Sequence, residues 1–567
     1  MLVISIIIYT ISIGGKKMET EKTMQKNAVV EKIKNGFNLA EKYVNKAVYS
    51  DFFLMALLLI IFITWVTECA PFGFITVSIL LTVMLVFARD VLPLIGSLFA
   101  SALMLYTKDF DELLYLWPIF IPLGLALIFF FVRNIIIKVK NHDKFKFGKM
   151  FFPQLAVSVA LLLGGVGVVS GEVYLGALGN ALGLGIAGFA VYVIARNFIS
   201  EDKSVDRITY FAKFLAFIGF VVALQLIVVI ARSGVEPTKW AKVVWHVGWG
   251  NRNNISTYLL FTAPMCLYLS TKYRYGVVYL LMGALQYVCL VLTFSRGGIL
   301  FGFIALVFGI AFVIFKAKNR KNQLIFLGSV LGVMLVVYLV MMKDINAAIN
   351  SLLSRGTGLS GRDDLYAEAW DLFKLHPFQG NGLGFEGTYG NFGDAIKMYW
   401  FHSTLFQVLA CMGIIGILAY GYSYVIKGIV LCKNWRNAFN LFVVVVFIGF
   451  EGYSMMDTGT FIPGGYPLIV LILMCLVEMF TSTPEAAASD KLEMAEARIQ
   501  RENARKKKAQ NSSVDGNDEP IIGTVASSDD GKMAEQEDCN MVVIESNFLQ
   551  AETPKSGDVA PIVEDAE

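Results

Sequence analysis

Long apolar runs, separated by short polar stretches, fill most of the chain between residues 51 and 481. Apolar runs of about 18 or more residues are typical of membrane spans, and a span in lipid must be helical because every backbone polar group needs a partner within its own segment. The pattern predicts fourteen apolar helices, at 51–69, 72–88, 91–106, 117–137, 153–171, 174–195, 209–231, 255–271, 275–295, 298–315, 323–342, 402–425, 437–456 and 462–481.

The runs at 72–88 and 91–106 are short, and only Arg89 and Asp90 separate them from each other. They fit a hairpin or a re-entrant pair, so we expect 12–14 transmembrane helices. Composition agrees with a lipid environment, because 56% of the 567 residues are hydrophobic and only 16% are charged, against about 25% in a soluble domain. The fold class predicted is therefore an all-α polytopic membrane protein. The net charge of +3 gives no indication of a nucleic-acid partner.

Basic residues in the joining loops predict the orientation, because Lys and Arg favour the cytoplasmic side. With a cytoplasmic N-terminus, the inner loops and their margins hold nineteen Lys and Arg, whereas the short outer loops hold six. This bias places both termini in the cytoplasm. Five of the six outer exceptions lie in the loops at 232–254 and 296–297. Since these charges break the orientation rule, we expect them to serve a function.

The chain divides into five parts. Residues 1–50 form a cytoplasmic N-terminal segment whose basic amphipathic helix over 19–50 favours an anionic leaflet. A transmembrane bundle over 51–342, a large outer loop over 343–401 and further spans over 402–481 follow. Residues 482–567 form a cytoplasmic tail, helical over 485–509 and then acidic, with fourteen acids and two lysines from 511 onward. That last composition is typical of disorder.

The outer loop over 343–401 is rich in aromatic residues, which indicates a folded structure. Within it a helix is predicted to begin at Ser360-Gly361-Arg362, because Asp363 and Asp364 suit the positive start of a helix. Its apolar face recurs at helical spacing, and we expect it to lie on the membrane surface or on the bundle. His376-Pro377 ends the helix, and the glycine-rich turn Gly380-Asn381-Gly382 follows.

The order of several short motifs resembles the O-antigen ligase and Wzy polymerase superfamily of bacterial envelope proteins. The resemblance covers residues 250–425, and rests on Ser295-Arg296-Gly297 before a span, Arg362, His376-Pro377 and Gly380-Asn381-Gly382 in an outer loop, His402-Ser403 at the next span, and Gly413-Ile414-Ile415-Gly416 within it. Ser403 departs from the asparagine that many members carry there.

The resemblance implies glycosyl transfer at the outer face of a bacterial cytoplasmic membrane. The donor would be a glycan on a polyprenyl diphosphate, typically undecaprenyl, and the acceptor a sugar, a lipid or a protein. Ligase and polymerase use the same donor and differ in the acceptor, so both interpretations stay open. The resemblance further implies inversion at the anomeric carbon with no cofactor and no metal, and membrane lipids are the remaining partners.

The residues suit that reaction. The departing diphosphate needs cations, and arginine stays charged and binds phosphate through two nitrogens. The acceptor hydroxyl needs a base, and histidine titrates near pH ~6.5. We therefore predict His402, Arg296 and Arg362 as catalytic residues and Arg252, Asn254 and Arg355 as donor-binding residues. Gly297 and Gly298 would admit a phosphate close to Arg296.

Three assignments are weighed against this site. His376 is expected to stabilise its turn, and Asp457 to orient His402 or to contact the acceptor. The acids at 109–112 offer oxygen ligands for a metal, but an outer loop poor in basic residues explains them equally well.

The alternative function is a transporter of a small anion or a lipid, which should place ionisable groups at mid-membrane. Most predicted spans lack such groups; Gln225 and Glu451 are the main exceptions.

Overall fold

The computed structural model describes residues 20–102, 110–166, 178–179, 181–248, 250–273, 275–317, 320–353, 362–385, 397–398, 400–457, 459–461 and 466–483, with single residues at 488, 499 and 503. The chain forms two compact units, Met1–Ala497 and Arg498–Glu567. All helices of the bundle lie in the first unit, and the tail predicted over 482–567 lies almost wholly outside the described residues.

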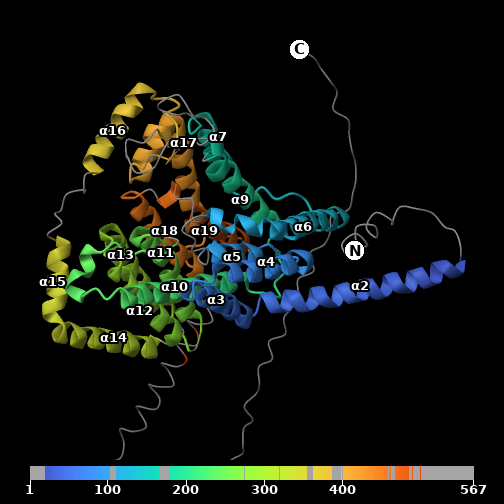
Figure 1. Cartoon of the computed structure of the whole chain (residues 1–567), viewed down its shortest axis with the longest axis horizontal. Coiled ribbons are helices and arrows are strands. Elements are labelled where there is room, and N and C mark those ends of the chain that lie inside the picture. The colour runs from blue at the N-terminus through green and yellow to red at the C-terminus, as the bar shows by residue number, and fades with distance from the viewer. Residues whose placement is uncertain are drawn as a thin grey trace, which may run out of the picture. The chain divides into compact units, whose positions relative to one another are not determined.

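Each of the fourteen predicted apolar segments contains a helix (Figure 1). In chain order these are α3 (Asp51–Val66), α4 (Ala70–Phe87), α5 (Leu92–Ala102), α6 (Phe120–Lys140), α7 (Phe151–Leu163), α9 (Ala187–Phe198), α10 (Arg207–Arg232), α11 (Arg252–Lys272), α12 (Val277–Leu292), α13 (Arg296–Lys316), α14 (Arg320–Val340), α17 (Thr404–Cys432), α18 (Ala438–Ser454) and α19 (Tyr466–Leu476). The predicted N-terminal helix is α2 (Thr20–Val48). Short helical turns add η2 (Phe110–Ile119), η3 (Leu182–Ile186), η4 (Pro237–Lys242), η5 (Gly459–Phe461) and η6 (Val477–Thr481).

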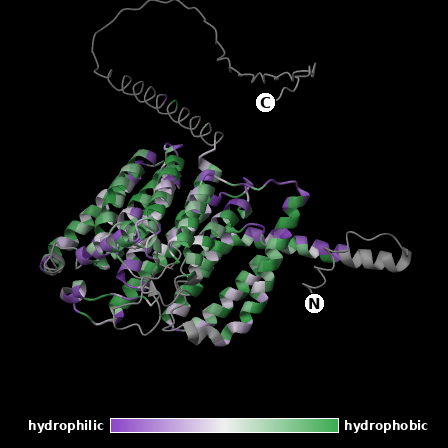
Figure 2. Ribbon diagram, turned by 90° about the horizontal axis from the view of Figure 1, so that it is seen from above, coloured by the Kyte–Doolittle hydropathy of each residue, from purple (hydrophilic) through white to green (hydrophobic). Residues whose placement is uncertain are grey.

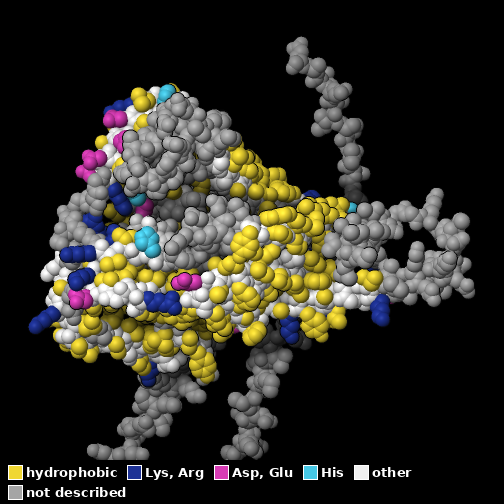
Figure 3. Space-filling model, viewed as in Figure 1, with side chains coloured by type: hydrophobic (Ala, Val, Ile, Leu, Met, Phe, Trp, Pro, Cys, Tyr) yellow, Lys and Arg dark blue, Asp and Glu magenta, His cyan; other side chains and the backbone are white. Residues whose placement is uncertain are grey.

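Several of these helices are long and apolar enough to cross a bilayer. Among the described residues six pass that test, or seven if α2 and α3 are one bent span, and five shorter apolar helices stand beside them. Hydrophobic residues run along most of their length (Figure 2). In Figure 3 hydrophobic side chains also cover much of the described surface, and exposed examples include Phe52, Phe72 and Ile128. An all-α polytopic membrane protein is therefore confirmed, and the number of 12–14 spans stays a prediction.

Helix α11 occupies the centre of the bundle, against α10, α12, α13 and α18. Every residue from Ile255 to Thr271 is buried, although α11 is less apolar than its neighbours. Its hydroxyl groups are satisfied internally: Ser256 Oγ lies 2.8 Å from Thr293 Oγ1, and Thr262 Oγ1 donates to Gln286 Oε1 over 2.8 Å. Polar side chains that bond to neighbouring helices are common where helices pack inside a membrane protein.

The basic loops meet on one side of the bundle, which we call the basic face. Arg207 Nε lies 2.6 Å from Asp90 Oδ2, Lys146 Nζ lies 2.6 Å from Glu201 Oε2, and Lys316 donates to the carbonyl of Arg436. These contacts join the ends of α4, α9, α13 and α17, all of which the sequence assigned to the same side. The opposite face carries the loop over 343–401. Which face is cytoplasmic stays a prediction.

The loop over 343–401 is folded where the structure describes it. The predicted helix is α16 (Arg362–Leu375), which ends directly before His376-Pro377 as expected; Ser360 lies outside the described residues. Helix α16 packs on α17 with Ala369 fully buried, so it lies on the bundle. The sequence missed α15 (Met342–Leu353), which packs against η4, and the two-residue strands β1 (Gly384–Phe385) and β2 (Lys397–Met398), paired antiparallel with Gly384 opposite Met398.

Helix α17 is broken at Gly413, which adopts φ 59° and ψ −150°. The segment after α16 fills the break. Pro377 O accepts from Ile414 N over 2.8 Å, and Phe378 O from Ile415 N over 3.2 Å. In return Asn381 N donates to Ala410 O over 2.9 Å and Gly382 N to Cys411 O over 3.0 Å. The His-Pro and Gly-x-Gly motifs therefore dock α16 onto α17 through backbone hydrogen bonds.

Only glycine fits at the contact points of this docked segment. A Cβ at Gly413 would lie 2.5 Å from Pro377 O, and one at Gly380, where φ is +76°, would lie 2.3 Å from Met412 N. At Gly421, eight residues farther along α17, a Cβ would meet nothing within 4 Å. The two glycines of one helix therefore differ in what a methyl group would meet.

We predict that Gly413→Ala lowers the free energy of unfolding by about 2–3 kcal/mol or more, because alanine strains the positive-φ backbone and pushes the docked segment away. The measurement is thermal unfolding of the purified chain in detergent or nanodiscs. Gly421→Ala is the matched control and should be neutral or stabilising. Equal melting temperatures for Gly413→Ala and the native chain would contradict the docking account.

Candidate functional site

Four chain segments meet on the opposite face near the ends of their helices. They are the start of α11, the α12–α13 junction, the start of α17 and the turn after α18. The start of α11 is fixed by Asn251, whose side chain accepts from Asn253 N over 2.9 Å. The α12–α13 junction turns sharply, because Phe294 adopts φ 53°. Each segment thereby presents polar groups to the same place.

A row of polar side chains runs through this meeting point. Ser295 Oγ lies 3.1 Å from Asn253 Oδ1 and 3.2 Å from Tyr453 Oη. Tyr453 Oη donates to Asp457 Oδ2 over 3.1 Å, and Asp457 Oδ1 lies 3.2 Å from His402 Nδ1. The Asp457 side chain is only 6% exposed, whereas that of His402 is 39% exposed. A buried polar row therefore ends in an imidazole that solvent or a ligand can reach.

The chemistry of the His402–Asp457 pair follows from this contact. A carboxylate only accepts hydrogen bonds, so His402 Nδ1 carries the proton that points at Asp457. In the neutral imidazole the other nitrogen, Nε2, then has the lone pair. A carboxylate that fixes the tautomer and the ring orientation of a histidine is the usual arrangement for a general base.

Helix α16 holds both partners of that pair. Arg362, its first residue, donates to the carbonyl oxygen of Met456, which directly precedes Asp457. Tyr366, one turn later, donates to the carbonyl oxygen of His402 over 3.2 Å, and its ring stacks on Phe406 at 4.3 Å. His402 adopts φ 50°, a conformation that these contacts stabilise. Burial raises the pKa of Tyr366 although Arg362 opposes the shift, so the hydroxyl stays a donor at neutral pH.

The predicted arginines flank this row. Arg296 follows Ser295 at the start of α13, and Arg252 precedes Asn253 at the start of α11. Both side chains are half-buried. The positive ends of α11, α13 and α16 thus carry one arginine each, a combination that favours anions. Figure 3 shows charged side chains gathered on the side of α15 and α16.

The other residues predicted from the sequence lie in different environments, or outside the described residues. Asn254 is half-buried, and its carbonyl oxygen accepts from Tyr466 Oη over 3.4 Å. Arg355 lies outside the described residues, as does Asp109. His376 is exposed, and its carbonyl oxygen accepts from Gly380 N over 2.9 Å, so it closes the turn through its backbone.

The structure gives Gly297 and Gly298 a packing role, and the approach of a phosphate beside them stays a prediction. A Cβ at Gly297 would lie 2.7 Å from the ring of Tyr453, and one at Gly298 would lie 2.7 Å from Ser256 Cβ. Neighbouring helices fill the space that a side chain would take at both glycines. Their small size lets α13 come close to α11 and α18, which brings Ser295 to Tyr453.

Sequence reasoning missed three residues of the row and its supports: Tyr453, Ser295 and Tyr366. A signal was present for two of them. Tyr453 stands four residues before Asp457, which places both near one face at the end of a helix, and Ser295 belongs to the Ser-Arg-Gly motif. Tyr366 carries no sequence pattern that separates it from other interfacial polar residues, whereas Asn253 stands at the start of a predicted span beside Arg252 and Asn254.

Residues 278–421 match the family model described as O-antigen ligase. This segment runs from α12 to the middle of α17 and includes Arg296, Arg362, His402 and the Gly413 break, but neither α11 nor Asp457. A comparison with curated proteins found no match. The family match confirms the resemblance over residues 278–421.

Proposed function

We propose that this protein is a membrane glycosyltransferase that moves a glycan from a polyprenyl diphosphate to an acceptor hydroxyl in bacterial envelope polysaccharide assembly. The opposite face would be the outer face of the cytoplasmic membrane, with both termini inside. The observation that carries the proposal is the His402–Asp457 pair, which α16 holds and whose histidine lies in the O-antigen ligase segment. A histidine base can accept the proton of the acceptor hydroxyl, and nearby arginines can stabilise the departing diphosphate.

The acceptor half of the reaction uses His402. Its Nε2 would take the proton of the acceptor hydroxyl as that oxygen attacks the anomeric carbon, and the imidazolium would be stabilised by Asp457. This step would need no metal, because His402 would take the acceptor proton and the arginines would stabilise the diphosphate. Tyr366 and Arg362 are positioning residues for this step, since they hold the backbone on both sides of the pair.

The donor half uses the arginines. As the anomeric C–O bond breaks, its electron pair stays on the diphosphate, whose charge grows. Arg252, Arg296 and Arg362 stand at three helix starts, where guanidinium groups and helix dipoles stabilise that charge together. Arg355 is proposed to join them from the preceding part of the loop.

The alternative, a transporter of a small anion or a lipid, receives less support. The clearest ionisable groups inside the described spans are Lys427 and Glu451, whose side chains are 12% and 7% exposed. They lie 3.0 Å apart, and Tyr424 Oη donates to Glu451 over 2.7 Å. A pair that neutralises itself in this way holds α17 against α18 and leaves no net charge to bind a transported anion.

We predict that His402→Ala lowers the turnover number for glycan transfer by about 10²–10⁴-fold, because the general base is lost. Asp457→Asn should lower it by roughly 10²-fold or more with an unchanged donor KM, because the amide no longer selects the tautomer. The measurement is transfer by the purified chain in proteoliposomes. His376→Ala, which removes an exposed imidazole on the same face, is the control and should keep native activity. Native turnover in His402→Ala would overturn the assignment of the base.

We predict that Arg296→Ala lowers turnover by about 10²–10³-fold, since one fixed cation at the leaving group is lost. Arg296→Lys should recover only part of the loss, because lysine keeps the charge without the two-nitrogen geometry. The same proteoliposome assay measures both variants. Lys239→Ala, which removes an exposed cation of a predicted outer loop, is the control and should keep the native turnover number. Equal turnover numbers for Arg296→Ala and Lys239→Ala would contradict the assignment of Arg296 as a catalytic residue.

A further inference from the structure

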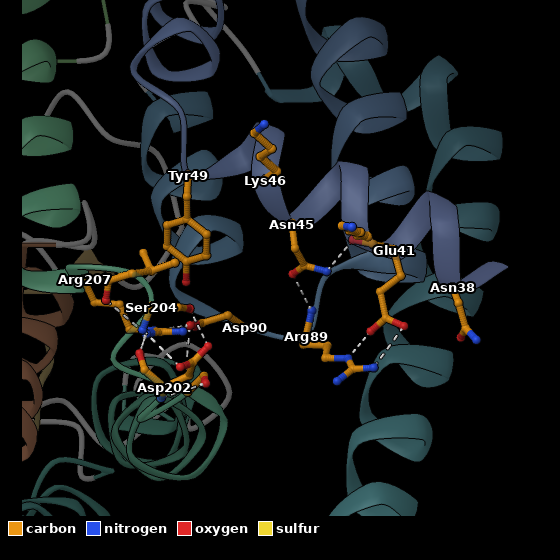
Figure 4. A pocket seen from close by; sticks show the side chains of 13 residues that line it. Asn38, Glu41, Asn45, Lys46, Tyr49, Arg89, Asp90, Asp202, Ser204 and Arg207 are labelled. Atoms are coloured by element: carbon orange, nitrogen blue, oxygen red, sulfur yellow. Dashed lines mark hydrogen bonds and ion pairs between the residues drawn. The ribbon is translucent and has the colours of Figure 1, made fainter. Parts of the chain in front are cut away.

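A polar cavity opens on the basic face, away from the candidate site above. It has a volume of about 720 Å³ and lies between the second half of α2, the turn between α4 and α5, and the segment that leads into α10 (Figure 4). The residues that line it are mainly charged or carry amides and hydroxyls. The glycosyl-transfer proposal uses none of them.

Two ion pairs hold the walls of this cavity. Arg89 forms a two-nitrogen contact with Glu41, and Arg207 Nε lies 2.6 Å from Asp90 Oδ2 with both side chains under 5% exposed. Asn45 ties the same walls together, because its Nδ2 donates to Phe87 O and its Oδ1 accepts from Arg89 N, each over 3.2 Å. These contacts, drawn in part in Figure 4, make the cavity a built structure in which both arginines are neutralised.

The surplus charge of the cavity comes from α2. Lys42 and Lys46 both line it, one helical turn apart, and both are exposed. Neither forms an ion pair with a described side chain. The opposing carboxylate, Asp202, is occupied by the backbone and hydroxyl of Ser204, whose hydrogen bonds lower its pKa. Asp202 keeps its negative charge, so the four cations and three carboxylates that line the cavity leave a net charge of +1, and both ammonium groups of α2 face it.

The position of α2 sets the depth of the cavity. Helix α2 meets the apolar helix α3 at 71°, so α2 runs close to the membrane plane if α3 crosses the membrane. Ile33, Leu39 and Tyr43 are exposed along α2 among its lysines, as in helices that lie in the membrane interface. Lys42 and Lys46 would then stand at the level of the lipid headgroups.

We propose that this cavity binds a phosphate group, through Lys42 and Lys46, and that the phosphate belongs to an anionic phospholipid of the leaflet at the basic face. Lysines near an anionic leaflet bind its headgroups electrostatically. Asn38, which also lines the cavity, offers a side-chain amide to the remaining phosphate oxygens. The site is independent of the proposed glycosyl transfer.

The test measures lipid binding to the full-length chain in detergent by native mass spectrometry. The probes are phosphatidylglycerol, phosphatidylcholine and inorganic phosphate. The native chain should retain phosphatidylglycerol and not phosphatidylcholine, and the double variant Lys42→Ala/Lys46→Ala should bind it about 30-fold more weakly. The matched control is Lys32→Ala/Lys34→Ala, which removes two exposed lysines of the same helix outside the cavity and should keep native binding.

Alanine favours helix, so both double variants should keep α2 intact. Equal loss of phosphatidylglycerol in the two double variants would overturn the proposal, because the binding would then follow only the charge of α2. Displacement of the bound lipid by millimolar inorganic phosphate would support the shared phosphate site. Lysine-dependent binding of inorganic phosphate without any retained lipid would overturn the lipid assignment.

Discussion

The broken helix α17 imposes the constraint on which the rest of the structure depends. In lipid each backbone amide and carbonyl group must find a partner inside the protein. At Gly413 the helix leaves such groups open, and the segment from Pro377 to Gly382 supplies the partners. The exchange ties the loop after α16 into the bundle, and so fixes α16 on α17.

The fixed position of α16 has a chemical consequence. Because α16 cannot move away from α17, Tyr366 reaches the His402 carbonyl and Arg362 reaches the Met456 carbonyl. These two hydrogen bonds hold His402 and Asp457 on opposite sides of a 3.2 Å contact. An interaction between backbone groups inside the bundle thus orders an imidazole and a carboxylate at its edge, and the small glycines of α13 bring Ser295 and Tyr453 behind them.

Much of this architecture could be predicted from the sequence, because membrane spans follow from apolar runs alone. The positions of all fourteen apolar helices, the start of α16 near Arg362 and its end at His376-Pro377 were predicted in this way. The break at Gly413 was not, since the signal for it is a glycine inside an apolar run, and Gly421 in the same helix leaves the helix intact. Helix α15 was missed because its mixed polar composition resembles a loop.

The site was predictable in its charged residues and not in its buried ones. Arg252 and Arg296 stand out because basic residues on the predicted outer side break the orientation rule, and His402 stands out through the resemblance. Tyr453 and Ser295 do not stand out by their chemistry, because hydroxyls are ordinary in packed membrane helices. Their roles depend on which helices touch, and the distances between residues 253, 295, 402, 453 and 457 arise only in the folded bundle.

The most direct test of the central claim is the stereochemistry of the transferred glycosyl bond. The purified chain would be given a polyprenyl diphosphate-linked glycan and an acceptor in buffer with EDTA, and the anomeric configuration of the product read by nuclear magnetic resonance. A single displacement, with His402 as base and the arginines at the diphosphate, predicts product in the presence of EDTA with inverted configuration. Retained configuration, or activity that returns only with a divalent cation, would contradict it.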